Sequence, residues 1–400
     1  MGVYLVRPSL PGLATLLPAS DMFIYLVLLS LTATISLASA PPSGSAQCRQ
    51  ITIPVSVTAL TQNIELTAPK NQSELTGFIT KVTSLSSNVT ADVLQGQRNL
   101  TANYKIWSLL CLPVTVSSER AITTVEFAVH GYWNFGGKGS KYNYVDVANR
   151  AGHAVFLYDR LGVGHSSKPD GIQQVQTATQ VEIAAQLIKY LKSGKSGYTF
   201  TRFIGLGHSY GSLQLLGLAS KYGNLLDAII LTGFSPFQGG ISTSLAAFGL
   251  TIASEQNKAR FGRLSGSLPS SYLTTQSIYN DQSAFFAFPF FDFNVLKIAS
   301  STKGTATLGE FLTLSASVAS NYTNPVFVVT GDKDFIFCGG DCFQKFPGAS
   351  VNLVEASGVL FPAVQKFNVS IPANTGHAIN VHFSAPNVYK EIQNWIASNV

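Results

Sequence analysis

One serine in the sequence has the neighbours that a catalytic nucleophile needs. Ser209 is the third residue of the Gly-His-Ser-Tyr-Gly segment at 207–211, which follows an apolar run at 203–206 and precedes a helix-like stretch. A strand, a tight turn and a helix in that order would hold the serine at the edge of a sheet, because glycines permit the cramped backbone. The alternative is a glycine-rich turn in which Ser209 only caps the helix. We expect Ser209 to be a nucleophile.

A serine hydroxyl is a poor nucleophile near neutral pH and needs a general base. Among the six histidines, His377 lies between a strand-like run at 367–371 and the last helix, predicted at 387–397. We therefore assign His377 as the base. The other histidines receive other roles: His130 holds an adjacent loop, His208 points away from the site and packs, and His153, His165 and His382 take turn or surface positions.

The base in turn needs an acid that orients its ring. Asp332 and Asp334 both follow a buried run at 325–330, and either could serve. We favour Asp334, because three residues beyond the strand leave its side chain room to turn toward His377. The predicted triad is therefore Ser209, Asp334 and His377.

A serine nucleophile also needs hydrogen-bond donors for the oxyanion that forms on its substrate. The backbone amide of Tyr210 lies at the start of the predicted helix, where amides have no partner in the helix and the dipole favours negative charge. A second amide is expected from Tyr132 or Trp133, which follow the strand predicted at 125–130.

The elements that would position these residues alternate along the chain. Short apolar runs that end at glycine or aspartate are typical of a parallel sheet buried on both faces. They lie at 125–130, 154–158, 203–206, 228–231 and 325–330. Helical patterns separate them, most clearly at 181–191. The pattern predicts an α/β fold with a doubly wound, mostly parallel sheet.

One long segment interrupts the alternation. Residues 240–320 separate two predicted strands, and an insertion of that length in an α/β domain is normally a helical lid or cap. Its aromatic run at 285–293 is expected to line the lid rather than only fill its core. The chain thus divides into an N-terminal extension packed on the core (41–118), a first core part (119–239), the lid and a second core part (321–400).

Together these motifs resemble the α/β-hydrolase superfamily over residues 120–240 and 321–400. The matching motifs are His130-Gly131, the Asp-Arg-Leu-Gly-Val-Gly-His-Ser turn at 159–166, the 207–211 segment, Gly331–Asp334 and Gly376-His377. The resemblance implies the chain order Ser209, Asp334, His377, a structural role for Asp159 and Arg160, and a lid where 240–320 fall. Within the superfamily the chain is most similar to secreted fungal hydrolases with a signal peptide and an N-terminal extension.

The resemblance also narrows the chemistry. Epoxide hydrolases and haloalkane dehalogenases of this fold use an aspartate nucleophile. Because Ser209 stands at that position here, the resemblance argues against both of these activities. The loop at His130 lacks both the Gly-Gly of many esterases and the Gly-Pro-Gly of proline aminopeptidase relatives, so cleavage of N-terminal proline is less expected.

The first 40 residues are typical of a secretory signal peptide, with translation starting at Met1 or Met22. An apolar stretch at 23–37 precedes Ala38-Ser39-Ala40, a small-residue cleavage site. Cleavage after Ala38 or Ala46 and retention as a single-pass anchor are the alternatives. Five sequons support export and predict N-glycosylation at Asn71, Asn88, Asn99, Asn321 and Asn368.

The four cysteines fit an oxidising compartment. We pair Cys338 with Cys342 and Cys48 with Cys111, although four cysteines allow three connectivities. The alternative, a metal site at 338–342, lacks a second ligand pair of matching spacing and is disfavoured.

The composition limits the function classes. Hydrophobic residues make up 46% of the chain and charged residues 12%, the opposite of the balance that disorder needs. The net charge is +6, but the basic residues are scattered and form no phosphate-tracking stripe. We expect no nucleic-acid partner, no cofactor or metal, and no stable membrane span after signal cleavage.

The sequence thus predicts a secreted serine hydrolase that cleaves a carboxylic ester of an apolar small molecule or lipid through an acyl-enzyme on Ser209. Other acyl chemistry, on an amide or a lactone or to an alcohol acceptor in secondary-metabolite tailoring, would use the same residues. A ligand-binding protein of this fold that does not turn over its ligand, and a structural glycoprotein, are the alternatives of another class. The oligomeric state stays open.

Overall fold

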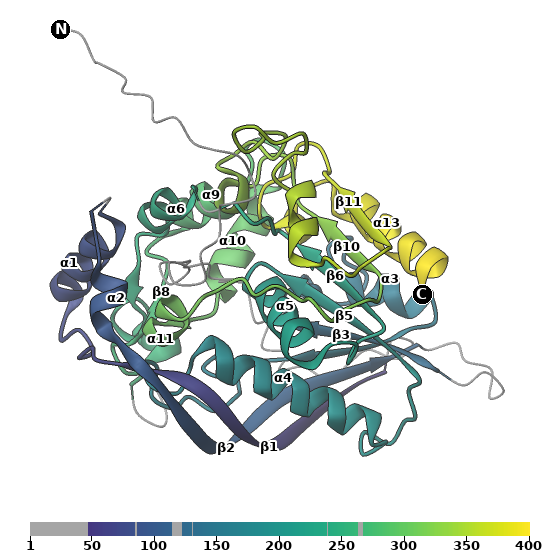
Figure 1. The fold of residues 1–400 in the computed structure, drawn as a ribbon, viewed down its shortest axis with the longest axis horizontal. Helices are drawn as coiled ribbons and strands as arrows, with labels where there is room; N and C mark the ends of the chain where they lie inside the picture. The colour runs from purple at the N-terminus through teal and green to yellow at the C-terminus, as the bar shows by residue number, and fades with distance from the viewer. Residues whose placement is uncertain (1–46, 85, 114–121, 130, 238, 263–266) are drawn as a thin grey trace, which may run out of the picture.

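A computed structural model describes residues 47–84, 86–113, 122–129, 131–237, 239–262 and 267–400. Its central feature is an eight-stranded sheet with the order β1-β2-β4-β3-β5-β6-β10-β11 (Figure 1). The two pairings that involve β2 are antiparallel, and the other five are parallel. This is the predicted α/β architecture with a mostly parallel sheet.

The strands of the parallel part are short, and all but β11 are buried almost throughout. They are β3 (Thr124–Val129), β4 (Ala154–Tyr158), β5 (Arg202–His208), β6 (Ala228–Thr232), β10 (Val326–Val329) and β11 (Phe367–Ser370). Valine, isoleucine, leucine and phenylalanine dominate them, as expected for strands with helices on both faces.

Helices flank this sheet on two sides. Helices α4 (Thr177–Lys192) and α5 (Tyr210–Tyr222) pack together, as do α3 (Tyr144–Arg150) and the C-terminal α13 (Ala385–Asn399) (Figure 1). In α4 the apolar side chains recur every three or four residues, and Ile183, Leu187 and Leu191 are completely buried. The core therefore lies between the sheet and these two helix pairs.

The predicted N-terminal extension supplies the first two strands of the same sheet. Strand β1 (Gln47–Ile64) pairs with β2 (Leu94–Leu112) over almost its whole length, and α1 (Gln72–Thr83) and α2 (Val89–Val93) lie between them in sequence. Every second residue of β1 is buried between positions 53 and 61, the alternation of a strand with one solvated face. The disulfide Cys48–Cys111 joins two directly paired positions. We call residues 47–112 the N-terminal hairpin.

The predicted lid at 240–320 has its own small architecture, which we call the cap. Its three short strands β7 (Thr251–Ile252), β8 (Tyr272–Thr274) and β9 (Ala306–Thr307) form an antiparallel sheet. Its helices are α6 (Ile241–Phe248), α7 (Ala253–Gln256), α8 (Lys258–Phe261), α9 (Ile278–Phe285), α10 (Phe293–Thr302) and α11 (Leu308–Leu312).

The remaining short elements belong to the loops that follow β3 and β10 and precede α13. One 3-10 turn spans Gly131–Trp133, α12 spans Phe335–Cys338, and two further 3-10 turns span Glu355–Leu360 and Ile379–Val381. The first 46 residues, which hold the predicted signal peptide, and His130 lie outside the described residues. No helix within the described part of the chain is long and apolar enough to cross a membrane.

Candidate active site

Ser209 lies on the sharp turn between β5 and α5. Its backbone has φ 55° and ψ −117°, a conformation that costs about 1–3 kcal/mol for a residue with a side chain. A Cβ at Gly207 would approach the carbonyl group of Gly211 to 2.7 Å, so the turn needs glycine there. The Ser209 amide donates to the Thr232 carbonyl of the neighbouring strand β6 over 2.9 Å. Such a strained serine after a sheet strand has the geometry of a nucleophile elbow.

Asp334 and His377 are in direct contact. His377 Nδ1 lies 2.8 Å from Asp334 Oδ2, and both side chains are buried. The other carboxylate oxygen accepts hydrogen bonds from the amides of Ile336 and Phe337 at 2.9 and 2.8 Å and so caps α12. Asp332 instead accepts from the amide of Thr375. Of the two candidate aspartates, Asp334 is the one that contacts the histidine.

The contact with Asp334 leaves the second nitrogen of the histidine available. With the proton on Nδ1, His377 Nε2 is a hydrogen-bond acceptor and hence a base. Within the part of the chain that the structure describes, neither Nε2 nor Ser209 Oγ has a hydrogen-bond partner, although both are buried. Other buried side chains of the described residues, such as Ser108 and Ser357, also lack a partner, so the observation matters here because it concerns the two atoms that the chemistry needs.

Ser209 and His377 both contact the end of strand β6 or the residue that follows it. Ser209 is bonded to Thr232, and a Cβ on the next residue, Gly233, would lie 3.1 Å from His377 Cε1. The same point is 2.8 Å from the Cε1 atom of His208. The absent side chain at 233 therefore leaves the space in which the two imidazole rings meet, with centroids 4.9 Å apart.

This arrangement corrects the expectation for His208. Its ring does not point away from the site: it packs between His377 and Tyr132, whose ring stacks on it at 4.2 Å. Its Nδ1 lies 3.0 Å from Thr232 Oγ1. The expectation was wrong because the space for the His208 ring is provided by Gly233, which follows the neighbouring strand β6 and is distant in sequence.

The oxyanion candidates lie where the strand ends predicted them. Tyr210 is the first residue of α5, so its amide has no acceptor within the helix. Tyr132 and Trp133 form the buried 3-10 turn after β3. The Tyr132 hydroxyl accepts from the amide of Asn380, three residues after His377, over 2.7 Å. The turn is therefore bonded to the loop that carries the histidine.

Aromatic side chains cover the histidine. The rings of Phe285, from the cap, and Phe337, from α12, have centroids 5.9 and 5.8 Å from that of His377. Within the 285–293 run, Phe286 and Phe291 are also buried, whereas Phe288 is 75% exposed. One end of the run thus faces the site and another part faces solvent.

His382 is the clearest site residue that the sequence reading missed. Predicted at a turn or on the surface, it is completely buried. Its Nε2 accepts hydrogen bonds from the amide of Ala287 in the cap, at 2.9 Å, and from the amide of Gly376 beside His377, at 3.1 Å. The expectation was wrong because the cap, distant in sequence, covers this position.

The Asp159–Ser166 turn fixes the base of the cap, as the structural role expected for it requires. Arg160 is completely buried and pairs with Glu310 of α11, which also accepts from Gln180 Nε2 at 2.9 Å. The Arg160 guanidinium lies 4.8 Å above the ring of Tyr210. Burial raises the pKa of Asp159 to about 6, although the carboxylate accepts from the His165 amide.

The loop that carries Asp334 is closed by the second disulfide. Cys338 at the end of α12 is bonded to Cys342, whose amide donates to the Asp332 carbonyl over 3.0 Å. Both predicted disulfides are thus present in the structure. The two cysteines are not available as metal ligands, and the described residues contain no cluster suited to a metal ion.

All five sequon asparagines lie at exposed positions: Asn71, Asn88, Asn99, Asn321 and Asn368. Asn71 caps α1 through its Oδ1 atom, and Asn368 Oδ1 accepts from Trp395 Nε1 at 2.9 Å. Both contacts use the amide oxygen, so they leave free the nitrogen to which a glycan would be attached.

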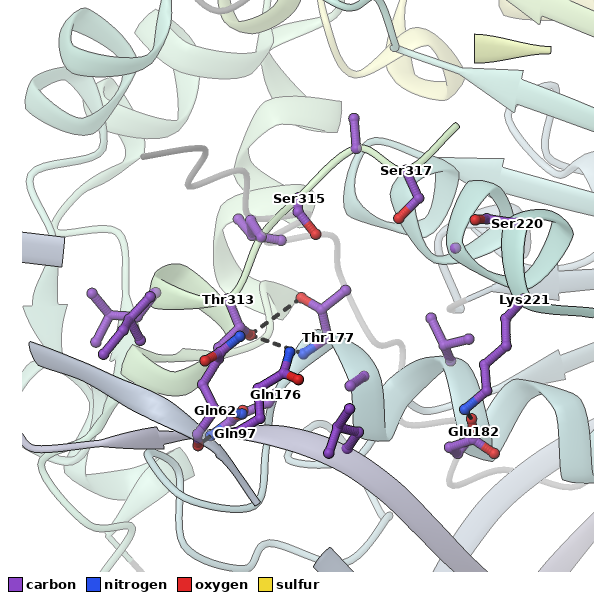
Figure 2. A pocket seen from close by; sticks show the side chains of 18 residues that line it. Gln62, Gln97, Gln176, Thr177, Glu182, Ser220, Lys221, Thr313, Ser315 and Ser317 are labelled. Carbon is purple, nitrogen blue, oxygen red and sulfur yellow. Dashed lines mark hydrogen bonds and ion pairs between the residues drawn. The ribbon is translucent and has the colours of Figure 1, made fainter. Parts of the chain in front are cut away.

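A cavity of about 390 Å³ lies between the N-terminal hairpin, helices α4 and α5, and the segment after α11. Figure 2 shows its polar wall, in which Thr313 and Thr177 are hydrogen-bonded to each other. Ser209, Asp334 and His377 are not among its lining residues. This cavity is therefore separate from the site around Ser209 and His377. One of its lining residues, Thr177, nevertheless has its hydroxyl 3.2 Å from that of Tyr210.

Comparison with known proteins agrees with the architecture. The sequence profile described as "alpha/beta hydrolase fold" matches residues 129–355, more than half of the chain. Proline iminopeptidases of Clostridium botulinum and Lactobacillus delbrueckii subsp. lactis are 33% and 32% identical over 90 and 114 residues. Those stretches are 22% and 28% of this chain and only 28% and 34% of the relatives' own length.

Solved structures resemble the chain at low identity. A soluble variant of monoglyceride lipase from Saccharomyces cerevisiae has a TM-score of 0.49 and 14% identity, over 74% of this chain and 92% of that one. Bromoperoxidase from Bacillus anthracis has a TM-score of 0.45 and 16% identity, over 74% and 95%. Identities this low do not bear on the substrate.

Proposed function

The chain belongs to the α/β-hydrolase fold family, and within it we propose a secreted serine hydrolase that cleaves a carboxylic ester of an apolar small molecule or lipid. The observation that carries the proposal is the strained, buried Ser209, whose neighbour His208 packs on His377, together with an Asp334–His377 pair in which Nε2 has no partner within the described residues. Nothing in a purely structural turn accounts for holding a serine in that conformation.

In this proposal His377 Nε2 takes the proton of Ser209 as the hydroxyl attacks the ester carbonyl. The amides of Tyr210 and of Tyr132 or Trp133 stabilise the negative charge that develops on the carbonyl oxygen. His377 then passes the proton to the leaving alcohol, and water releases the acid from the acyl-enzyme by the reverse sequence. Asp334 keeps the imidazole in the required tautomer.

The charges of the cap favour an ester over a substrate with a free N-terminal amine. An amine-binding site needs a carboxylate that is not already neutralised. Among the described cap residues, the two buried carboxylates already have cationic partners: Asp281 is 3.0 Å from Lys303, and Glu310 is paired with Arg160. The other two, Glu255 and Asp292, are exposed. This argues against the proline iminopeptidase activity of the short sequence matches.

The cover over the triad favours an apolar substrate. Phe285 and Phe337 approach the imidazole of His377, and Phe248 stacks on Phe285 with centroids 5.4 Å apart. A substrate that reaches Ser209 has to displace or slide between these rings. Burial of an alkyl chain there would contribute about 0.8 kcal/mol per methylene group.

Export and glycosylation complete the proposal. The signal-like residues 1–40, the two disulfides and the five exposed sequons are consistent with passage through an oxidising compartment. Peptide-N-glycosidase treatment of the protein from the culture medium should lower its mass, and N-terminal sequencing should start near residue 41.

The decisive experiment is labelling with a fluorophosphonate probe, with the modified peptide mapped by mass spectrometry. We expect one labelled residue, Ser209, and no labelling of Ser209→Ala. A matched control is Ser212→Ala: the hydroxyl of this buried serine three residues later donates to the Thr232 carbonyl, at 3.0 Å, so its loss should leave labelling intact. Equal labelling of the wild type and Ser209→Ala would contradict the proposal.

Substrate assays then separate the alternatives. A series of p-nitrophenyl esters of increasing chain length should be hydrolysed faster than a prolyl coumarylamide. The reverse preference would move the assignment to a peptidase. Transfer to an added alcohol would indicate an acyltransferase, and tight retention of ligand without labelling would indicate a binding protein.

A further inference from the structure

His382 connects two segments that are far apart in sequence. Its Nε2 accepts from the amide of Ala287, inside the aromatic run of the cap, and from the amide of Gly376, adjacent to His377. Its Nδ1 lies 2.9 Å from the Ala378 carbonyl on the other side of His377. Because a carbonyl only accepts, Nδ1 carries the proton and the ring is neutral.

Further backbone bonds join the same two segments. The Ala378 amide donates to the Phe285 carbonyl over 2.9 Å, and the Phe383 amide donates to the Phe290 carbonyl over 3.0 Å. The rings of Phe286 and Phe291 have centroids 5.7 and 6.2 Å from that of His382. When these contacts form, the cap is closed over His377 and the loop that carries His377 is fixed.

We propose that neutral His382 is a positioning residue that couples closure of the cap to placement of the His377 loop, and that its protonation releases both. A proton on Nε2 would point at two N–H donors at once. Both hydrogen bonds would be lost, and a positive charge would be left in a dry apolar environment. The cap half of the inference is independent of catalysis, whereas the part that concerns the base rests on the proposed function.

Burial of the ring, and to a smaller extent the groups around it, set the pH at which release occurs. Burial lowers the pKa of His382 to about 4, and the nearby His377 lowers it too, whereas the Ala378 carbonyl, Asp332 and Asp334 oppose the shift. The cap side presents the uncharged rings of Phe286 and Phe291. Once the cap opens, the ring meets water and its pKa returns toward about 6.5.

The sign of the effect follows from these two values. The closed form binds the proton less tightly than the open form, so opening takes up a proton between about pH 6.5 and pH 4. Closure is fully favoured above that window and weakens as the pH falls through it. With these pKa values the open population at pH 5 should be about 30-fold larger than above pH 7.

Hydrogen exchange of the intact protein tests the cap half directly. Exchange of the Ala287 and Gly376 amides, corrected for the intrinsic pH dependence, should accelerate about 30-fold from pH 8 to pH 5. Peptides from strand β6 should remain protected. Equal acceleration of β6 would mean global unfolding and would overturn the proposal, as would exchange at 287 and 376 that does not change.

Two variants assign the effect to this ring. In His382→Gln the side-chain oxygen can accept from the same amides but cannot titrate, so the acceleration should disappear. His165→Gln is the matched control, because His165 is exposed and should leave the acceleration unchanged. If His382→Gln is unfolded, the β6 comparison in the wild type still decides the question.

The pH profile of ester hydrolysis tests the base half. If His382 holds the His377 loop, the acid limb of kcat/KM should move to lower pH in His382→Gln, with little change at pH 8. An unaltered acid limb would overturn the coupling to the base. Absence of any hydrolysis, together with the expected exchange behaviour, would refute the proposed function and leave the cap release standing.

Discussion

Two regions of the molecule each contain a disulfide and a side chain that caps a helix, but these features have different roles in the two regions. The N-terminal hairpin carries the disulfide Cys48–Cys111 and an asparagine, Asn71, that caps α1 through a bond from the Glu74 amide at 3.0 Å. The loop after β10, residues 331–342, carries Cys338–Cys342 and an aspartate that caps α12. In the second region the capping side chain has another partner, His377.

The two regions differ in what the capping side chain contacts. Asn71 is exposed, and its side chain caps the start of α1. Asp334 is completely buried, and its two oxygens serve different partners: one accepts from the amides of α12 and the other contacts the imidazole. The helix cap thus fixes the rotamer of a carboxylate that orients a base. The same local motif stabilises one region and positions a reactive group in the other.

Replacing Asp334 should give the largest effect. In Asp334→Asn the side-chain oxygen can still cap α12, but an amide facing His377 Nδ1 favours the wrong tautomer. We expect kcat/KM to fall about 10³–10⁴-fold while the thermal midpoint stays nearly unchanged. Steady-state kinetics and calorimetry on the same preparation measure both. A fall of less than tenfold would place the functional acid elsewhere.

The two disulfides should have opposite consequences. Their sequence separations are 63 and 4 residues, for which chain entropy predicts about 4 and about 2 kcal/mol of stability. Cys48→Ala with Cys111→Ala should therefore lower the free energy of unfolding more, with kcat unchanged. Cys338→Ala with Cys342→Ala should cost less stability but reduce kcat ten- to a hundredfold, because a displaced acid misplaces the base.

Denaturant unfolding and ester hydrolysis of the two double variants would settle this contrast. If loss of Cys338–Cys342 left kcat unchanged, the hydrogen bonds of α12 alone would hold Asp334, and the disulfide would be only a structural link.

Replacing Asn71, the residue that caps helix α1, should give the smallest effect. Asn71→Ala removes one hydrogen bond at the start of an exposed helix and should cost about 1 kcal/mol, with no change in kcat. Hydrogen exchange in residues 72–83 measures it locally. Because the change also removes a sequon, Ser73→Ala is the control: it removes the sequon and leaves the capping oxygen in place. Equal destabilisation by both variants would trace the effect to a glycan.

Much of the fold followed from local pattern. Every apolar run that predicted a parallel strand forms one, and the helix expected at 181–191 lies within α4. These predictions succeed because burial on both faces demands continuous apolar runs, and a strand or helix shows that demand within a few residues. The boundaries differ by at most four residues.

The candidate site was only partly readable. Ser209 and its glycines form one short segment, and Asp334 and His377 follow strand ends. The ring of His208 and the whole role of His382 were misjudged, because each depends on a backbone that is distant in the chain: Gly233 in one case and Ala287 in the other. No spacing within the sequence reports such contacts.

The sequence by itself determined the α/β fold, the elbow at Ser209 and the chemical types of its partners, since these depend on residue type and on neighbours a few positions away. Only the tertiary structure shows that Asp334, which the sequence favoured over Asp332 without excluding the latter, contacts the histidine. It alone shows that one capping side chain also contacts an imidazole whereas the other caps only a helix, and that His382 joins the cap to the loop of His377. Each of these is a contact between distant segments, and its free energy exists only after the sheet has brought the segments together.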